Sequence, residues 1–158
     1  MTKPAVAQLT PHHLCIAVPD MEEAIAWYGA ILGFEVEERF HIAGIPADGA
    51  FLRRPELRIE LFQAEGVAPV PEHRRSPNSD LRTAGTKHIA FTVPDLQAVL
   101  VQLVARGVDI AALQRSLGQP MLPDADPLAR GKPPVCSLFV RDPSGTLIEL
   151  MDRRQAPA

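Results

Sequence analysis

Hydrophobic and polar positions alternate in the first regular segment of the chain. Residues 14–18 place aliphatic side chains at every second position, and this period of two predicts a β-strand. Asp20 follows, with Glu23 three residues later, a pairing typical of a helix N-cap. An apolar stripe at helical spacing then runs to Gly33, which is a natural helix end. The pattern therefore predicts a strand followed by a helix.

Three further strands are expected after this helix. They are predicted at residues 34–42, 50–53 and 57–63, with Gly- or Pro-bearing turns between them. Residues 1–63 thus form a first module of one strand, one helix and three strands. Residues 64–86 are rich in Pro, Ser and Gly, and this composition predicts a linker.

The same order of elements is predicted again over residues 87–152. A helix capped by Asp95 and ended by Gly107 lies between a first strand and three later ones. The expected strands are 87–93, a short one near Val108, 135–141 and 146–151. Residues 153–158 are left as a tail. The chain is therefore predicted to hold two modules of like organisation within one domain.

A sequence repeat supports this division. The stretch from His13, HLCIAVPDM, recurs from His88 as HIAFTVPDL, and Ile59-Glu60-Leu61 recurs as Ile148-Glu149-Leu150. The first pair of matches lies 75 positions apart and the second lies 89 apart, so the second copy carries about 14 extra residues. The Pro-rich stretch 114–134 can contain them. A connection of that length predicts a lid or a binding loop.

Composition narrows the class of protein. The chain has 158 residues, 46% of them hydrophobic and 22% charged, which fits one globular domain. A net charge of −3 gives no reason to expect a nucleic acid partner. The longest apolar run is too short to cross a bilayer, so no membrane partner is expected. Two cysteines and the absence of a signal-peptide pattern predict a cytoplasmic location.

Strand parity indicates which side chains share a surface. In each predicted strand the aliphatic residues can face the helix, while the His or Glu faces the opposite, concave side. Two imidazoles and two carboxylates gathered in one cavity would be poorly satisfied without a cation between them. The four repeated residues therefore predict one shared divalent metal ion. Nitrogen and oxygen ligands of this kind suit Zn, Ni, Co, Fe or Mn. The predicted ligands are His13, Glu60, His88 and Glu149.

Each of these residues also has a plainer interpretation when taken alone. A single strand His is usually structural or on the surface, and a Glu between two aliphatic residues usually faces solvent. The matched duplication favours the metal site over four separate coincidences. His12 has the wrong parity for the site, and His41 and His73 have no repeat partner, so all three are expected outside it.

Two basic residues are candidates for substrate binding. Arg58 shares the strand face of Glu60 and could bind a substrate carboxylate, although a surface arginine is an equally simple interpretation. Lys132 lies in the stretch 114–134 and could close over an anionic substrate, or could simply be solvated.

The chain resembles a known superfamily through motifs spread over most of its length. These are HLCIAVPDMEEAIAWYGAILGF, RIELF, GTKHIAFTVPDL and DPSGTLIEL. They resemble the vicinal oxygen chelate superfamily, which includes glyoxalase I, methylmalonyl-CoA epimerase, fosfomycin-resistance enzymes and extradiol dioxygenases. The resemblance implies an α+β fold of two βαβββ modules that form a cup-shaped, barrel-like mixed sheet with the helices outside. It also implies metal ligands at His13, Glu60, His88 and Glu149, and a homodimer.

The resemblance further implies a type of reaction. A fourth protein ligand at Glu60 leaves two open positions on the metal, as in glyoxalase I and the epimerases. The leading interpretation is a metal-dependent isomerase or lyase that removes a proton next to a metal-bound carbonyl of a small oxygenated substrate. By the likeness to glyoxalase, Glu149 is the candidate base. Leu52 stands where the epimerases carry a further acid, and no secure match to glutathione-binding residues is present.

Two alternatives stay open at this point. One is an Fe(II)-dependent dioxygenase on the same scaffold, which oxygen consumption with an aromatic diol would reveal. The other is a metal-free binding or drug-resistance protein, which needs no ligand set. Metal analysis of protein purified without chelator separates this last class from the enzymes.

Overall fold

The chain forms two compact units. A computed structural model describes residues 5–6 and 9–154, and the predicted tail lies outside the described residues from position 155 onward. The N-terminal unit comprises residues 1–67 and the C-terminal unit residues 68–158. Each unit is described by itself below. Within the described residues, no helix is both long enough and apolar enough to span a membrane.

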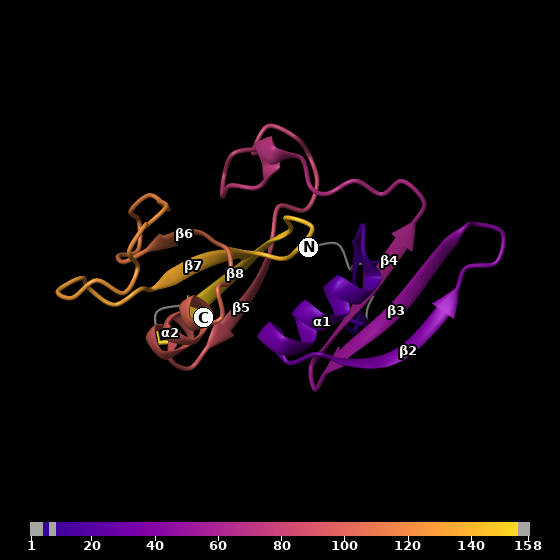
Figure 1. Cartoon of the computed structure of the whole chain (residues 1–158), viewed down its shortest axis with the longest axis horizontal. Helices are drawn as coiled ribbons and strands as arrows, with labels where there is room; N and C mark the ends of the chain where they lie inside the picture. The colour runs from indigo at the N-terminus through magenta and orange to yellow at the C-terminus, as the bar shows by residue number, and fades with distance from the viewer. Residues whose placement is uncertain (1–4, 7–8, 155–158) are drawn as a thin grey trace. The chain divides into compact units, whose positions relative to one another are not determined.

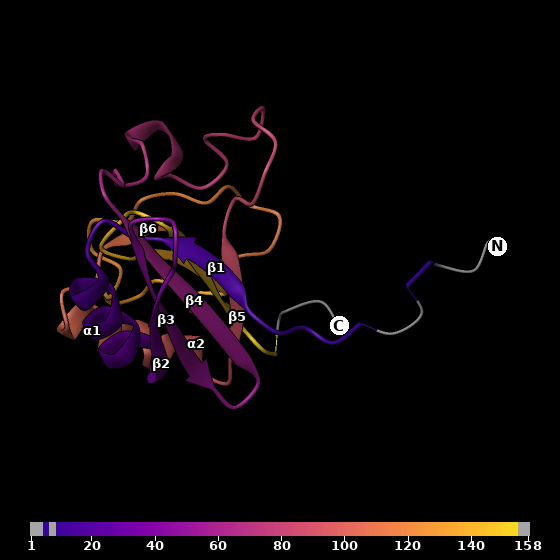
Figure 2. The same cartoon turned by 90° about the vertical axis from the view of Figure 1, so that its right-hand side faces the viewer.

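The N-terminal unit is a four-stranded mixed sheet with one helix. Its strands follow the order β1-β4-β3-β2, in which β1 runs parallel to β4 and the other neighbours are antiparallel (Figure 2). Helix α1 packs against β4 on one face of this sheet. The elements are β1 (Leu14–Ala17), α1 (Met21–Leu32), β2 (Glu35–His41), β3 (Ala47–Arg54) and β4 (Leu57–Ala64).

The C-terminal unit repeats this topology. Its sheet has the order β5-β8-β7-β6, again with the first and last strands parallel, and α2 packs against β8 (Figure 1). A short 3₁₀ helix, η1 (Glu72–Arg74), precedes the sheet. The other elements are β5 (Ile89–Val93), α2 (Leu96–Ala105), β6 (Ile110–Gln114), β7 (Ser137–Arg141) and β8 (Leu147–Asp152). The structure confirms the α+β class and the two βαβββ modules.

The helices begin and end at the residues that local chemistry favours. The Asp20 side chain accepts a hydrogen bond from the Glu23 amide, and Gly33 ends α1 in a left-handed conformation with φ of 68°. Asp95 caps α2 in the same way. Both caps confirm the sequence prediction.

Several strand boundaries differ from the prediction by one to three residues, and two of them have a clear local cause. β3 begins at Ala47 rather than residue 50, so Gly49 lies inside the strand instead of in the preceding turn. The ring of Phe40 lies over Gly49, and a Cβ at this position would come within 2.2 Å of that ring. β6 begins at Ile110 rather than near Val108. The Val108 amide instead donates to the Leu103 carbonyl and so helps to close the end of α2.

The core lies between each sheet and its helix. In both units the aliphatic residues that flank the glutamate of the last strand are buried on the helix side, and the glutamate stays partly exposed on the other face, as strand parity requires. On that other face of the C-terminal unit, Leu147 is also buried, in a small cluster with Ala111 and Phe139. Full burial of one such side chain contributes about 1.5–3 kcal/mol. The fully buried residues include Tyr28, Leu52, Ile59, Leu61, Leu96, Leu100, Leu138 and Ile148.

The C-terminal unit includes most of the segment predicted as a linker. The Val70 amide donates to the carbonyl of Ser144 in the β7–β8 turn, at 2.7 Å. Arg75 Nε donates to the Val70 carbonyl, and Arg141 Nε donates to the Arg75 carbonyl, each at 2.7 Å. Val70 and Arg75 therefore join this part of the predicted linker to the β7–β8 hairpin.

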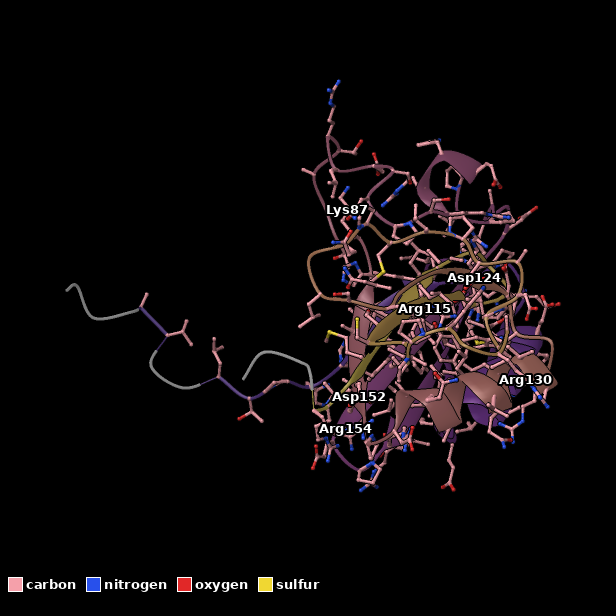
Figure 3. The ribbon with its side chains drawn as sticks, turned by 90° about the vertical axis from the view of Figure 1, so that its left-hand side faces the viewer. Lys87, Arg115, Asp124, Arg130, Asp152 and Arg154 are labelled. Carbon is pink, nitrogen blue, oxygen red and sulfur yellow. The ribbon has the colours of Figure 1, made fainter. Side chains whose placement is uncertain are left out.

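Asp152 connects the end of β8 to the start of α2. Its side chain is buried, accepts two hydrogen bonds from the Arg154 guanidinium and lies 3.5 Å from the Leu96 amide. Figure 3 shows Asp152 and Arg154 next to each other. The Arg154 hydrogen bonds hold the pKa of this carboxyl well below its usual range.

The two N-caps allow a matched stability test. Because each aspartate satisfies an otherwise unpaired helix amide, Asp20→Ala and Asp95→Ala should each lower the free energy of unfolding by about 1 kcal/mol in denaturant titrations. Asp20→Asn and Asp95→Asn keep an oxygen acceptor and should lose much less. Alanine variants as stable as the parent would show that the caps do not stabilise the helices.

Candidate metal centre

The N-terminal unit brings one predicted His and one predicted Glu together. His13 directly precedes β1, and parallel pairing sets Cys15 of β1 opposite Glu60 of β4. His13 Nε2 lies 3.1 Å from Glu60 Oε2, and the two side chains are 33% and 13% exposed. Phe51 is the partner of Glu60 across β3 and β4, and its ring stands edge-on to the His13 imidazole.

The C-terminal unit contains the same arrangement. His88 directly precedes β5, and Ala90 pairs with Glu149 of β8. His88 Nε2 lies 3.2 Å from Glu149 Oε2, with side chains 36% and 15% exposed. Phe139 is the partner of Glu149 across β7 and β8, and its ring centroid lies 5.0 Å from that of His88. Each unit thus carries one His–Glu pair beside a phenylalanine.

Sequence reasoning missed the two phenylalanines. Phe51 and Phe139 lie 88 positions apart and the two glutamates 89 apart, so the aromatic residues do not align at the offset that revealed the repeat. A signal was present in the local patterns Gly49-Ala50-Phe51 and Ser137-Leu138-Phe139, in which a small residue precedes an apolar residue and then Phe. Among the described residues, neither unit alone gathers three or more His, Cys, Asp or Glu side chains able to hold a metal ion.

The two carboxylates have different hydrogen-bond donors. Ser137 Oγ donates to Glu149 Oε1 at 2.7 Å, and Ser137 is only 3% exposed. The matching position in β3 is Gly49, because Gly49 pairs with Phe62 as Ser137 pairs with Met151. The N-terminal carboxylate therefore has no hydroxyl donor from that position.

Glu60 instead lies beside a thiol. Burial, the negative charge of Glu60 and a hydrogen bond to it raise the pKa of Cys15 to about 11. The thiol is therefore neutral at physiological pH and can act as a donor to the carboxylate. Both cysteines are free in this structure.

Arg58, the candidate for binding a substrate carboxylate, binds a carboxylate of its own unit. Its Nε and Nη2 donate to the two oxygens of Glu37, at 2.6 and 2.9 Å. Arg53 Nη1 approaches the same carboxylate at 3.7 Å. Glu37 lies where the β2–β3 register shifts, between Val36 and Glu38. Arg58 lowers the pKa of Glu37, and Glu37 raises that of Arg58.

Lys132, the candidate to close over a substrate, lies within an ion-pair cluster of the stretch 114–134. Lys132 Nζ contacts Asp124 Oδ1 and the Asp126 carbonyl, both at 2.7 Å. Arg115 Nη2 donates to Asp124 Oδ2 at 3.0 Å and to the Pro127 carbonyl at 2.8 Å. Figure 3 shows Arg115 beside Asp124. The hydrogen bonds of Lys132 and Arg115 lower the pKa of Asp124 to about 2.

Comparisons with known proteins agree with this architecture. A family model described as Glyoxalase/Bleomycin resistance protein/Dioxygenase superfamily matches residues 12–121. Ethylmalonyl-CoA/methylmalonyl-CoA epimerase from Cereibacter sphaeroides is 31% identical over 148 residues, covering 88% of this chain and 94% of the relative. Human mitochondrial methylmalonyl-CoA epimerase is 28% identical over 143 residues, covering 88% and 71%.

The solved structures show the same fold at lower identity. The trypanothione-dependent glyoxalase I of Leishmania major superposes with a TM-score of 0.64 at 22% identity, covering 93% of this chain and 88% of that one. This match supports the α+β architecture with its two repeated units.

The ion-pair cluster around Asp124 generates a test by proteolysis. Because the folded-state pKa of about 2 lies below the unfolded value of roughly 3.9, the carboxylate stabilises the loop fully above pH ~4 and loses this effect as the pH falls towards 2. Asp124→Asn should mimic the loss at neutral pH and accelerate tryptic cleavage at Arg130 severalfold. Asp126→Asn is the matched control, since Lys132 binds the backbone carbonyl of Asp126. Equal cleavage of both variants would contradict a role for the Asp124 side chain.

Proposed function

Because the chain belongs to the Glyoxalase/Bleomycin resistance protein/Dioxygenase superfamily, we propose that it is a metal-dependent isomerase. The reaction removes and returns a proton at a carbon next to the carbonyl group of a small oxygenated substrate. One observation supports this proposal above the others. Each unit carries a His–Glu pair at equivalent strand positions, with nitrogen–oxygen distances of 3.1 and 3.2 Å.

These distances fit two neighbouring ligands of one ion. Metal–nitrogen and metal–oxygen bonds of roughly 2.1 Å at a right angle place the two ligand atoms about 3 Å apart. Neutral imidazole and carboxylate are suitable donors for Zn, Ni, Co, Fe or Mn. We propose that one divalent ion takes both pairs, so that His13, Glu60, His88 and Glu149 are its four protein ligands.

Glu149 is the proposed base. A bound divalent ion supplies a positive charge that polarises the carbonyl and lowers the pKa of the neighbouring C–H. Glu149 accepts the proton at Oε2, while the Ser137 hydroxyl stays bonded to Oε1 and limits rotation of the carboxyl group. The proton can then return from the same oxygen to the other face of the planar carbanion after the carbanion has turned, and this inverts the carbon. Phe139 packs edge-on against His88 and restrains the imidazole ring that lies next to Glu149.

The epimerase relatives point to an acyl thioester as the substrate. Their names specify coenzyme A thioesters of methylmalonate and ethylmalonate, and we propose a carbon acid next to a thioester carbonyl for this chain as well. Leu52, which stands where an epimerase would carry a further acid, is 1% exposed on the helix side of the sheet. The proposal therefore assigns proton transfer to Glu149 alone.

A homodimer in the cytoplasm completes the proposal. The resemblance to the superfamily motivates the dimer, and the two free cysteines fit a reducing compartment.

Metal content tests the ligand set directly. Protein purified without chelator should bind one divalent ion per chain, and His13→Ala and His88→Ala should each weaken binding by at least tenfold in competition titrations, because each removes one ligand of the same ion. His41→Ala, at an exposed imidazole paired with Asp48, is the control and should bind normally. A shared site would be contradicted if the protein bound two ions per chain. It would also be contradicted if removing one His–Glu pair released only one of two bound ions.

Mixing two variants distinguishes a site within one chain from a site across a dimer. One variant lacks His13 and Glu60, and the other lacks His88 and Glu149. If the site spans two subunits, co-refolded heterodimers should regain one intact metal site. No regain would place both pairs of a site in one chain.

Proton exchange tests the base. Glu149→Gln should lower metal-dependent solvent-deuterium uptake into methylmalonyl-CoA by about 10²-fold or more, because a missing general base costs that order of rate. The metal content of the same sample should stay measurable. Glu38→Gln, on the exposed strand β2, is a control for the loss of one surface charge. Full exchange by Glu149→Gln would remove this residue from the role.

A further inference from the structure

The N-terminal unit has a small basic pocket next to its His–Glu pair. The pocket has a volume of about 170 Å³ and lies at the β3–β4 hairpin, beside the segment that leads into β1. His12, one of its lining residues, has its Nδ1 2.7 Å from Nδ1 of His13. The lining residues are Pro11, His12, Arg53, Arg54, Glu56 and Arg58, together with Pro55 and Leu57.

The charges around this pocket favour an anion. Three arginines and Glu56 line it, Glu37 contacts Arg58 and Arg53, and Glu35 is the cross-strand partner of Arg53. Arg54 is partly engaged because its Nη1 donates to the Leu32 carbonyl at the end of α1. Arg53 and Arg58 face each other across β3 and β4 and remain at least partly exposed. The lining itself therefore carries three arginines against one glutamate, and two of the guanidinium groups are accessible to a ligand.

Glu37 already shows how an oxyanion binds here. Its carboxylate receives both Nε and Nη2 of Arg58 in a bidentate contact, with Arg53 next to it. The register shift in β2 turns this side chain towards the two arginines. Such contacts between exposed groups are individually weak, so an arriving carboxylate or phosphate can exchange with Glu37.

The pocket also lies close to His13 and Glu60, two of the proposed metal ligands. Arg58 is two residues before Glu60 on the same face of β4, and alternate residues of a strand are about 6.6 Å apart. The side chain of His12 precedes that of His13 in the chain and contacts it. An anionic group bound at Arg58 would therefore belong to a molecule that reaches Glu60.

We propose that the pocket formed by His12, Arg53 and Arg58 is an oxyanion subsite that binds a carboxylate or phosphate group of the substrate, with Glu37 as the internal competitor for the arginines. The subsite rests on the proposed function, because the oxyanion belongs to the molecule whose carbonyl is activated. The oxyanion is either a carboxylate on the acyl group of the substrate or a phosphate on the carrier that holds the acyl group.

A second ion pair in the same unit provides a matched control. Arg39 makes a bidentate contact with Glu22 on the helix side of β2, beside a larger pocket of about 450 Å³. That pair is exposed, as the Arg58–Glu37 pair is, but the residues that line its pocket include neither a second arginine nor His13 or Glu60. Variants of Arg39 in β2 and of Glu22 in α1 therefore change the same charges in the same unit, away from the proposed subsite.

The experiment measures binding of malonate and of inorganic phosphate to the metal-free protein in the presence of chelator. Arg58→Gln should raise the Kd of the bound anion about three- to fivefold, in the range for a partly exposed ion pair. Glu37→Gln should lower the Kd by a similar factor, because it removes the competitor. Both effects should shrink as the salt concentration rises.

The arms of the experiment separate the outcomes. Malonate binding that depends on Arg58 identifies a carboxylate subsite, and phosphate binding that depends on Arg58 identifies a phosphate subsite; both support the proposal. Arg39→Gln and Glu22→Gln should leave both Kd values unchanged. The proposal is overturned if neither anion responds to Arg58→Gln and Glu37→Gln, or if the Arg39 and Glu22 variants respond equally.

The result is separable from the proposed activity. Anion binding is measured without metal, whereas deuterium exchange requires it. Exchange that persists without Arg58-dependent anion binding would overturn the subsite and leave the isomerase proposal standing. Arg58-dependent anion binding without any deuterium exchange would support the subsite and overturn the isomerase proposal.

Discussion

The parallel pairing of the first and last strand of each unit is the constraint on which the candidate site depends. Cys15 lies opposite Glu60 in one sheet and Ala90 lies opposite Glu149 in the other. This register places the imidazole that precedes the first strand within 3.2 Å of a carboxylate on the last strand. A slip of one residue would turn each glutamate towards the helix and bury it in the core. The apolar residues buried between each sheet and its helix therefore fix the position of the His–Glu pairs.

The two units have the same frame but different surroundings for their carboxylates. Ser137 supplies a hydroxyl to Glu149, while Gly49 at the matching place leaves room for the Phe40 ring and Glu60 lies beside the Cys15 thiol. A duplicated site needs such differences if its two acids are to have different roles. The carboxylate with the fixed hydroxyl partner is the one to which the proposed mechanism assigns the proton transfer.

Local rules account for what the sequence predicted well. The caps at Asp20 and Asp95, the end of α1 at Gly33 and the alternation of buried and exposed strand residues depend on neighbours a few positions away. The repeat added what no single segment reveals, namely the prediction that His13, Glu60, His88 and Glu149 share one metal ion. The structure brings His13 to Glu60 and His88 to Glu149, each within its own unit, and the shared ion stays a prediction.

The features that were not predicted depend on long-range packing. Arg58 meets Glu37 because of an irregular register between β2 and β3, and a bulge has no clear mark in residue types alone. Lys132 is held by Asp124 and Asp126 rather than facing an open pocket, a result of how the whole stretch folds back. The contacts of the predicted linker are of the same kind, since the hydrogen bond from Arg141 Nε to the Arg75 carbonyl joins two residues 66 positions apart.

The cluster around Asp124 has a consequence for how this architecture can diversify. Arg115 and Lys132 hold the insertion by side-chain contacts within it, and Leu122 joins it to the sheet through two backbone hydrogen bonds with Leu113 of β6. An insertion that carries its own scaffold can lengthen, shorten or change sequence while the strands that position His88 and Glu149 keep their register. The surface of the insertion and the proposed metal site can then change independently within one small protein.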